Sequence, residues 1–81
     1  MERNRYIVLF FTQYGAISYS RKLKDAGIDN ITRPVPRALS SSCGICVEME
    51  TDQDLIQFLT EDVEKLCIEE NGAYKVIYEE Q

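Results

Sequence analysis

The pattern of hydrophobic and polar positions predicts a central strand, a helix and two strands of alternating polarity. The unbroken apolar run over residues 6–11 is too short for a buried helix and predicts a central strand. After Thr12, which can cap a helix, small and apolar residues recur every three or four positions as far as Gly27, predicting a helix over 13–26. Alternating apolar residues predict strands over 44–50 and 74–78.

A further short extended stretch is predicted over residues 28–35, where Pro34 and Pro36 limit backbone pairing. This stretch is therefore expected at an edge of the sheet. Residues 36–42 follow as a loop.

A second helix is predicted from the apolar residues between Leu55 and Cys67, which keep helical spacing. Its cap is Thr51 or Asp52, and Asn71-Gly72 ends it. A strand over 63–69 that breaks this helix is the alternative, and the continuous apolar stripe disfavours it.

The resulting order is strand, helix, strand, strand, helix, strand. It predicts an α+β fold of the ferredoxin-like βαββαβ type, forming a single domain over residues 1–81. In this fold a four-stranded antiparallel sheet, with strand order 4-1-3-2, carries both helices on one face. The strand over 6–11 is apolar on both faces, so the uncovered face needs a partner, a second copy or the chain's own tail. We therefore expect a homodimer formed through the open sheet face.

Composition and charge narrow the class of protein. The chain has 81 residues, of which 44% are hydrophobic, so it is too apolar for a disordered segment and too short for two domains. It contains no apolar run long enough for a membrane span or a signal peptide, so a cytoplasmic protein without membrane contact is expected. The net charge is −5, with no basic run, which argues against nucleic acid as the partner.

The charge is divided unevenly along the chain. Residues 1–43 carry seven basic and three acidic side chains, a net charge of +4, whereas residues 44–81 carry two basic and eleven acidic ones, a net charge of −9. The basic half is therefore the part of the chain that attracts an anionic ligand or an acidic protein surface.

Cysteine and histidine counts limit the chemistry further. Three cysteines cannot all pair within one chain, and the absence of histidine removes Cys-His and Ser-His dyads and histidine-ligated zinc. Neither a metal nor a cofactor is expected. Cys67 falls on an apolar stripe and is expected to fill the core.

Cys43 is the candidate reactive residue. The predicted fold brings residues 12–15, 34–43 and 71–73 to one end of the sheet, with Cys43 near the N-terminus of the first helix, where unpaired N–H groups favour an anion. A thiol in such surroundings holds a larger thiolate fraction at neutral pH. Further groups on the same loop can hold a thiolate, a persulfide or a phosphate-like anion: Arg37, Ser40, Ser41 and Ser42.

The stretch Pro34-Val35-Pro36-Arg37-Ala38-Leu39-Ser40-Ser41-Ser42-Cys43-Gly44 resembles the core motif of the selenium/sulfur (Se/S) carrier protein-like family. That motif has two prolines one residue apart, an arginine, two variable positions, serines, a cysteine and a glycine. The apolar first strand and the tyrosine-rich last strand also fit. Ala38 stands where the family often has an acidic residue, so a salt bridge from that position to Arg37 is missing.

The resemblance implies a carrier more than an enzyme. It implies that Cys43 holds a persulfide or perselenide between a donor and an acceptor protein. The binding residues around the cysteine would then be the remaining members of the motif, namely Arg37, Ser40, Ser41, Ser42 and Gly44.

Two other functions stay open. Cys43-Gly44-Ile45-Cys46 spells C-x-x-C, so Cys46 is a candidate second thiol in a redox or metal sensor. However, Cys46 falls in an extended strand and points to the opposite face from Cys43, and a complete zinc site would need a second chain. The other alternative is a non-catalytic interaction or regulatory module that binds a partner through the open sheet face.

Overall fold

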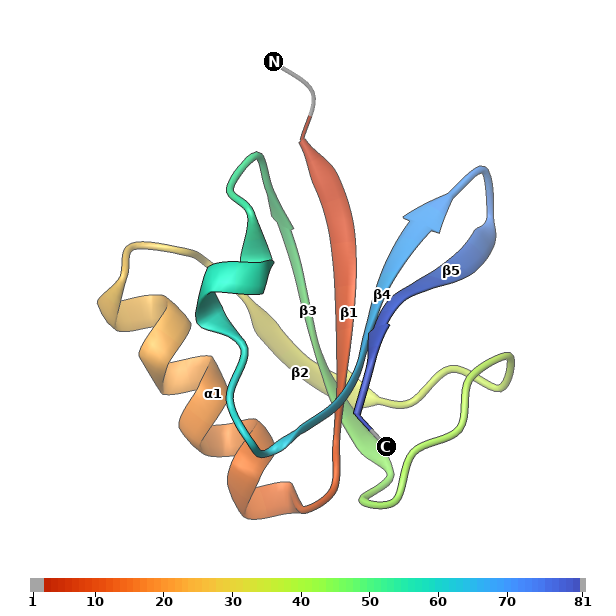
Figure 1. The fold of residues 1–81 in the computed structure, drawn as a ribbon, viewed down its shortest axis with the longest axis horizontal. Helices are drawn as coiled ribbons and strands as arrows, with labels where there is room; N and C mark the ends of the chain where they lie inside the picture. Colours follow the sequence, from red (N-terminus) through yellow and green to blue (C-terminus); the bar gives the residue numbers. More distant parts are fainter. Residues whose placement is uncertain (1–2, 81) are drawn as a thin grey trace.

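The computed structural model describes residues 3–80 and contains one antiparallel sheet with a helix on one face (Figure 1). The strands are β1 (Asn4–Phe10), β2 (Ile31–Pro34), β3 (Ile45–Thr51), β4 (Val63–Glu70) and β5 (Ala73–Glu79). They form a five-stranded sheet in the order β2-β3-β1-β4-β5. The helices are α1 (Gln13–Asp25) and the 3₁₀ turn η1 (Leu55–Phe58).

The predicted ferredoxin-like fold is wrong. The segment expected to form a second helix divides into η1 and β4, so five strands take the place of four, and the order 4-1-3-2 does not occur. The reason is that β4 lies between β1 and β5 and is buried on both faces of the sheet. Leu66 packs into the core beside α1, and the adjacent Cys67 packs on the opposite face. Consecutive apolar residues of this kind have the same appearance in a sequence as one stripe of a helix.

The turn at Asn71-Gly72 joins β4 to β5 and does not end a helix. Both residues have positive φ, 51° for Asn71 and 79° for Gly72. A two-residue turn of this type matches the right-handed twist of paired strands. Because β4 runs antiparallel to β1, with Arg5 opposite Glu69, this turn lies at the end of the sheet away from residues 12–15.

The main core lies between α1 and the sheet. Phe10 and Tyr19, from β1 and α1, pack with ring centroids 5.2 Å apart. The helix begins at the cap Thr12, whose Oγ1 accepts the Gly15 N–H at 3.0 Å. It ends before Gly27, which takes a left-handed φ of 83° that favours glycine.

A second, smaller core lies on the opposite face of the sheet. Its fully buried members are Ile7, Leu9, Cys46 and Cys67, and they are packed against by Val35, Leu39 and Tyr74. Val35 and Leu39 belong to the loop between β2 and β3, which swings past β1 toward the β4–β5 side before it returns (Figure 1). The chain's own loop thus covers apolar residues for which the sequence predicts a partner, a second copy or the chain's own tail as the cover. The homodimer stays a prediction, without this argument in its favour.

Gly15 allows the first turn of α1 to approach the segment before β4. A Cβ atom added at Gly15 lies 2.7 Å from the Cβ of Asp62. Alanine is favoured over glycine inside helices by about 1 kcal/mol, yet forcing an atom into a packed contact costs about 1–3 kcal/mol. We therefore expect Gly15→Ala to lower the free energy of unfolding, measured by urea denaturation, by a net amount of about 1 kcal/mol.

Ser18→Ala, in the same helix, is the matched control because it changes helix propensity without this contact. It is expected to leave the free energy of unfolding unchanged or slightly higher. A Gly15→Ala protein more stable than the wild type would contradict the close approach to Asp62.

Candidate functional site

The loop that carries Cys43 is closed at its base by backbone contacts. The N–H of Val35 donates to the carbonyl of Gly44 at 3.1 Å, and Gly44 has a left-handed φ of 80°. Within the loop, the N–H of Leu39 donates to the carbonyl of Pro36 at 3.0 Å. Glycine at position 44 is therefore explained by the backbone conformation that closes the loop.

Cys43 is a half-buried residue, and its sulfur lies close to polar groups of the protein. Its thiol donates to the carbonyl of Ile45 at 3.2 Å, and the hydroxyl of Ser41 lies 3.8 Å from the sulfur. The side chain packs against the main core, on the same side of the sheet as α1. Residue Cys43 is therefore partly accessible to solvent.

Three elements meet around Cys43. Gln13, at the start of α1, donates its side-chain amide to the carbonyl of Cys43 at 3.4 Å. Ser41 donates its hydroxyl to the carbonyl of Phe10, at the end of β1, at 2.9 Å. Cys43 itself leads into β3. The end of β1, the first turn of α1 and the start of β3 thus form one site.

The donors of Ser42 are occupied by a carboxylate from β4. Glu64 accepts the Ser42 N–H at 3.1 Å and the Ser42 hydroxyl at 3.4 Å, and its carboxylate also lies 3.4 Å from the Ser41 hydroxyl. Sequence reasoning missed Glu64 because it placed this residue in a helix. Had β4 been recognised, pairing of Phe10 with Val63 would have placed Glu64 beside the end of β1.

Arg37 and Ser40 are not brought into the site by any polar contact. Both are exposed, and among residues 3–80 neither takes part in a hydrogen bond or an ion pair. An anion-facing role for Arg37 and for Ser40 stays a prediction.

The other two cysteines differ from Cys43 in accessibility. Cys46 and Cys67 are fully buried in the second core. Burial raises the pKa of the Cys46 thiol to about 11, and burial also raises the pKa of Cys67. Cys43 packs against the main core and Cys46 lies in the second core, on the opposite face of the sheet. This arrangement disfavours a disulfide between them. Across residues 3–80, no three or more cysteine, aspartate or glutamate side chains are grouped to hold a metal ion.

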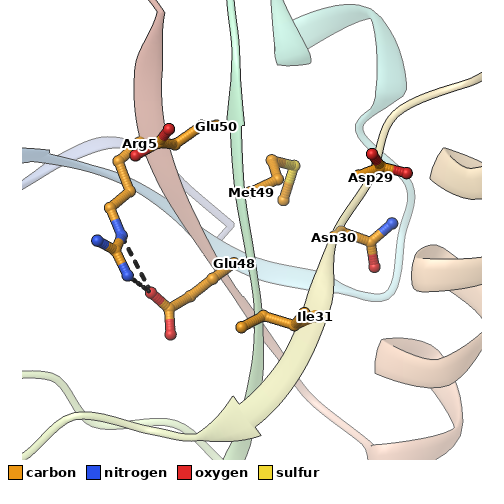
Figure 2. Close-up of a pocket in the computed structure, with 7 residues that line it drawn as sticks. All are labelled: Arg5, Asp29, Asn30, Ile31, Glu48, Met49 and Glu50. Carbon is orange, nitrogen blue, oxygen red and sulfur yellow. Dashed lines mark hydrogen bonds and ion pairs between the residues drawn. The ribbon is translucent and has the colours of Figure 1, made fainter.

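A charged pocket lies at the other end of β3 (Figure 2). Its volume is about 280 Å³. Arg5 and Glu48 both line it and form an ion pair, with 3.0 Å between Nη2 and Oε1. Glu48 also pairs with Arg33 at 3.1 Å, and Arg5 with Glu69 at 3.4 Å. The hydrogen bond to Glu48 raises the pKa of Arg5. These charged groups are paired with one another. The pocket is also distant from the candidate site, because six residues of extended chain, roughly 20 Å, separate Met49 from Cys43.

No helix within residues 3–80 is long and apolar enough to cross a membrane. No curated protein and no solved structure matches the chain. A family model described as putative Se/S carrier protein-like matches residues 5–79, a span that runs from β1 to β5 and includes Cys43, its loop and Glu64. The chain belongs to the putative Se/S carrier protein-like family.

Proposed function

We propose that this protein carries a sulfur or selenium atom on Cys43 between a donor and an acceptor protein. Family membership supports the carrier role in general. The observation that supports Cys43 as the carrying residue is the contrast among the three thiols. Residue Cys43 is half-buried, whereas Cys46 and Cys67 are fully buried with raised pKa values.

The transfer needs no acid–base residue and no external oxidant. The Cys43 thiol loses its proton to solvent, and its thiolate attacks the terminal sulfur of the donor's persulfide. One S–S bond forms on Cys43, the donor's S–S bond breaks, and the donor thiolate leaves. An acceptor thiolate then attacks the terminal sulfur on Cys43, and Cys43 leaves as a thiolate. A perselenide follows the same course. A chain without histidine can perform both steps.

The test is sulfur loading by a cysteine desulfurase with cysteine, followed by intact-protein mass spectrometry. We expect a gain of one sulfur atom in the wild type, mapped to Cys43 by peptide analysis, and no gain in Cys43→Ser. The double variant Cys46→Ala/Cys67→Ala keeps only the reactive thiol and is expected to load like the wild type. No adduct, or an adduct spread over all three cysteines, would overturn the proposal.

A further inference from the structure

The position that an anion would take beside Cys43 is already filled by the chain itself. The Ser42 N–H and hydroxyl donate to the carboxylate of Glu64 at 3.1 and 3.4 Å. The Ser41 hydroxyl, which donates to the Phe10 carbonyl, lies 3.4 Å from the same carboxylate. Ser41 is also the hydroxyl 3.8 Å from the Cys43 sulfur. Ser42, one of the donors that the sequence offers for an incoming anion, is therefore paired with the carboxylate of Glu64 near the thiol.

At the start of α1, two of the backbone N–H groups already have acceptors within the chain. The Gly15 N–H donates to the side chain of Thr12 at 3.0 Å, and the Ala16 N–H donates to the Thr12 carbonyl at 3.2 Å. A second carboxylate, that of Asp62, lies against Gly15. In the part of the chain that the structure describes, no ion pair includes Glu64 or Asp62.

We propose that the negative charge of Glu64 determines which sulfur donors react readily with Cys43. The site takes sulfur from a thiol-bound persulfide, which carries at most one negative charge, and disfavours free, doubly charged sulfur anions such as thiosulfate. This inference rests on the proposed carrier function. A unit negative charge roughly 6 Å from an approaching monovalent anion lowers the rate at which the anion reaches the thiol by about threefold in water, and by more near a protein surface. For a doubly charged anion the same charge gives about tenfold.

Sulfur transfer from thiosulfate is chemically possible at the same thiol, so selection matters. The Cys43 thiolate attacks the outer sulfur of thiosulfate, a new S–S bond forms, the S–S bond of thiosulfate breaks, and sulfite leaves. This step differs from transfer by a protein persulfide in its leaving group and in the charge and shape of the donor. Glu64 acts on the charge.

The charge effect is measured by alkylating Cys43 with iodoacetate, which is anionic, and with iodoacetamide, which is neutral. The ratio of the two rates cancels differences in thiol exposure and reports the local charge. We expect Glu64→Gln to raise the iodoacetate-to-iodoacetamide ratio about threefold, because glutamine keeps an acceptor for Ser42 but has no charge. Glu70→Gln, which makes the same change in net charge at the far end of β4, is expected to leave the ratio unchanged.

Two further measurements separate charge from loop structure. Ser42→Ala removes one hydrogen bond to Glu64 but keeps the carboxylate, so its ratio is expected to equal that of the wild type. In the wild type itself, raising the ionic strength is expected to raise the ratio, because salt screens the carboxylate. Equal ratios in the wild type, Glu64→Gln and high salt would overturn the inference.

Sulfur loading then tests the choice of donor directly. We expect the wild type to gain sulfur from a persulfide-loaded cysteine desulfurase and to gain it slowly from thiosulfate, with Glu64→Gln accelerating the thiosulfate reaction about tenfold. A wild type that takes sulfur equally fast from both donors would overturn the selection by Glu64 but not the carrier function. A wild type loaded by neither donor would overturn the carrier function, and the alkylation ratio would still decide the charge effect.

Discussion

Replacing Leu9 by alanine is expected to lower the free energy of unfolding by about 2–5 kcal/mol. Leu9 lies on the face of the sheet opposite α1 and is fully buried in the second core. Truncating a buried leucine removes its transfer free energy and leaves a cavity, which is the origin of that range. The measurement is urea denaturation followed by circular dichroism, with the unfolding free energy extrapolated to water.

The controls for Leu9→Ala are chosen by burial. Ile31→Ala removes an aliphatic side chain of similar size from the edge strand β2, where Ile31 is 55% exposed, and is expected to change stability by about 0.5 kcal/mol or less. Leu39→Ala truncates the loop residue that packs over the second core. Its loss of unfolding free energy is expected to lie between those of Leu9→Ala and Ile31→Ala. If Leu9→Ala costs no more than Ile31→Ala, the second face is open in solution.

The second core also connects stability to the candidate site. The segment between β2 and β3 supplies Val35 and Leu39 to that core, and the same segment continues through the serines to Cys43. Hydrogen bonds from Val35 to Gly44 and from Ser41 to Phe10 attach the loop to itself and to β1. The segment that packs over the second core therefore also carries Cys43 to its place beside the start of α1.

The sequence was informative where one local signal has one interpretation. The apolar run predicted over 6–11 is β1, the capped amphipathic segment predicted over 13–26 is α1, and the alternating residues predicted over 44–50 are β3. The edge position expected from Pro34 and Pro36 is that of β2. Each of these elements has its own start signal, end signal and periodicity.

The region from Leu55 to Glu70 could not be assigned from periodicity alone. Leu55 belongs to η1, and Val63, Leu66 and Cys67 belong to a strand buried on both faces, yet their spacing matches a helix. The Asn71-Gly72 pair was the signal that could have decided the case. Followed by an alternating strand, it is a strong hairpin signal, and it was interpreted as the end of a helix.

The site was predictable to the extent that its elements were. Cys43 lies beside the end of β1 and the start of α1, and these elements and β3 were all recognisable in the sequence. Glu64 was not predictable, because its place depends on β4 lying next to β1. Nor could the sequence show that Ser42 is already paired with a carboxylate.

Alkaline solution is expected to destabilise the protein through its buried thiols and Tyr19. Burial raises the pKa of Cys46 from 9.0 to about 11 and the pKa of Tyr19 from 10.0 to about 12. Below pH 9 both states of the chain keep the Cys46 proton, so its contribution to stability is fully present. As the pH rises from 9 toward 11, the unfolded chain releases this proton while the folded chain retains it, and the free energy of unfolding falls.

The size of this loss follows from the shift. A difference of about two pKa units at Cys46 corresponds to about 2–3 kcal/mol by pH 11, and Tyr19 adds a loss of the same sign above pH 10. Urea denaturation from pH 7 to pH 11, with a reductant present, measures the effect. Cys46→Ala is expected to be less stable at neutral pH but to lose less between pH 9 and pH 11.

Tyr19→Phe separates the phenol from the thiol. The Tyr19 hydroxyl is buried, and among the described residues it has no hydrogen-bond partner, so its removal is expected to cost little at neutral pH. This variant should follow the wild type up to about pH 10 and lose less stability above it, whereas Cys46→Ala diverges from about pH 9. A wild type whose unfolding free energy is level from pH 7 to pH 11 would show that solvent reaches both groups. Cys46 would then compete with Cys43 as a reactive thiol, and the contrast that supports Cys43 as the carrier would be lost.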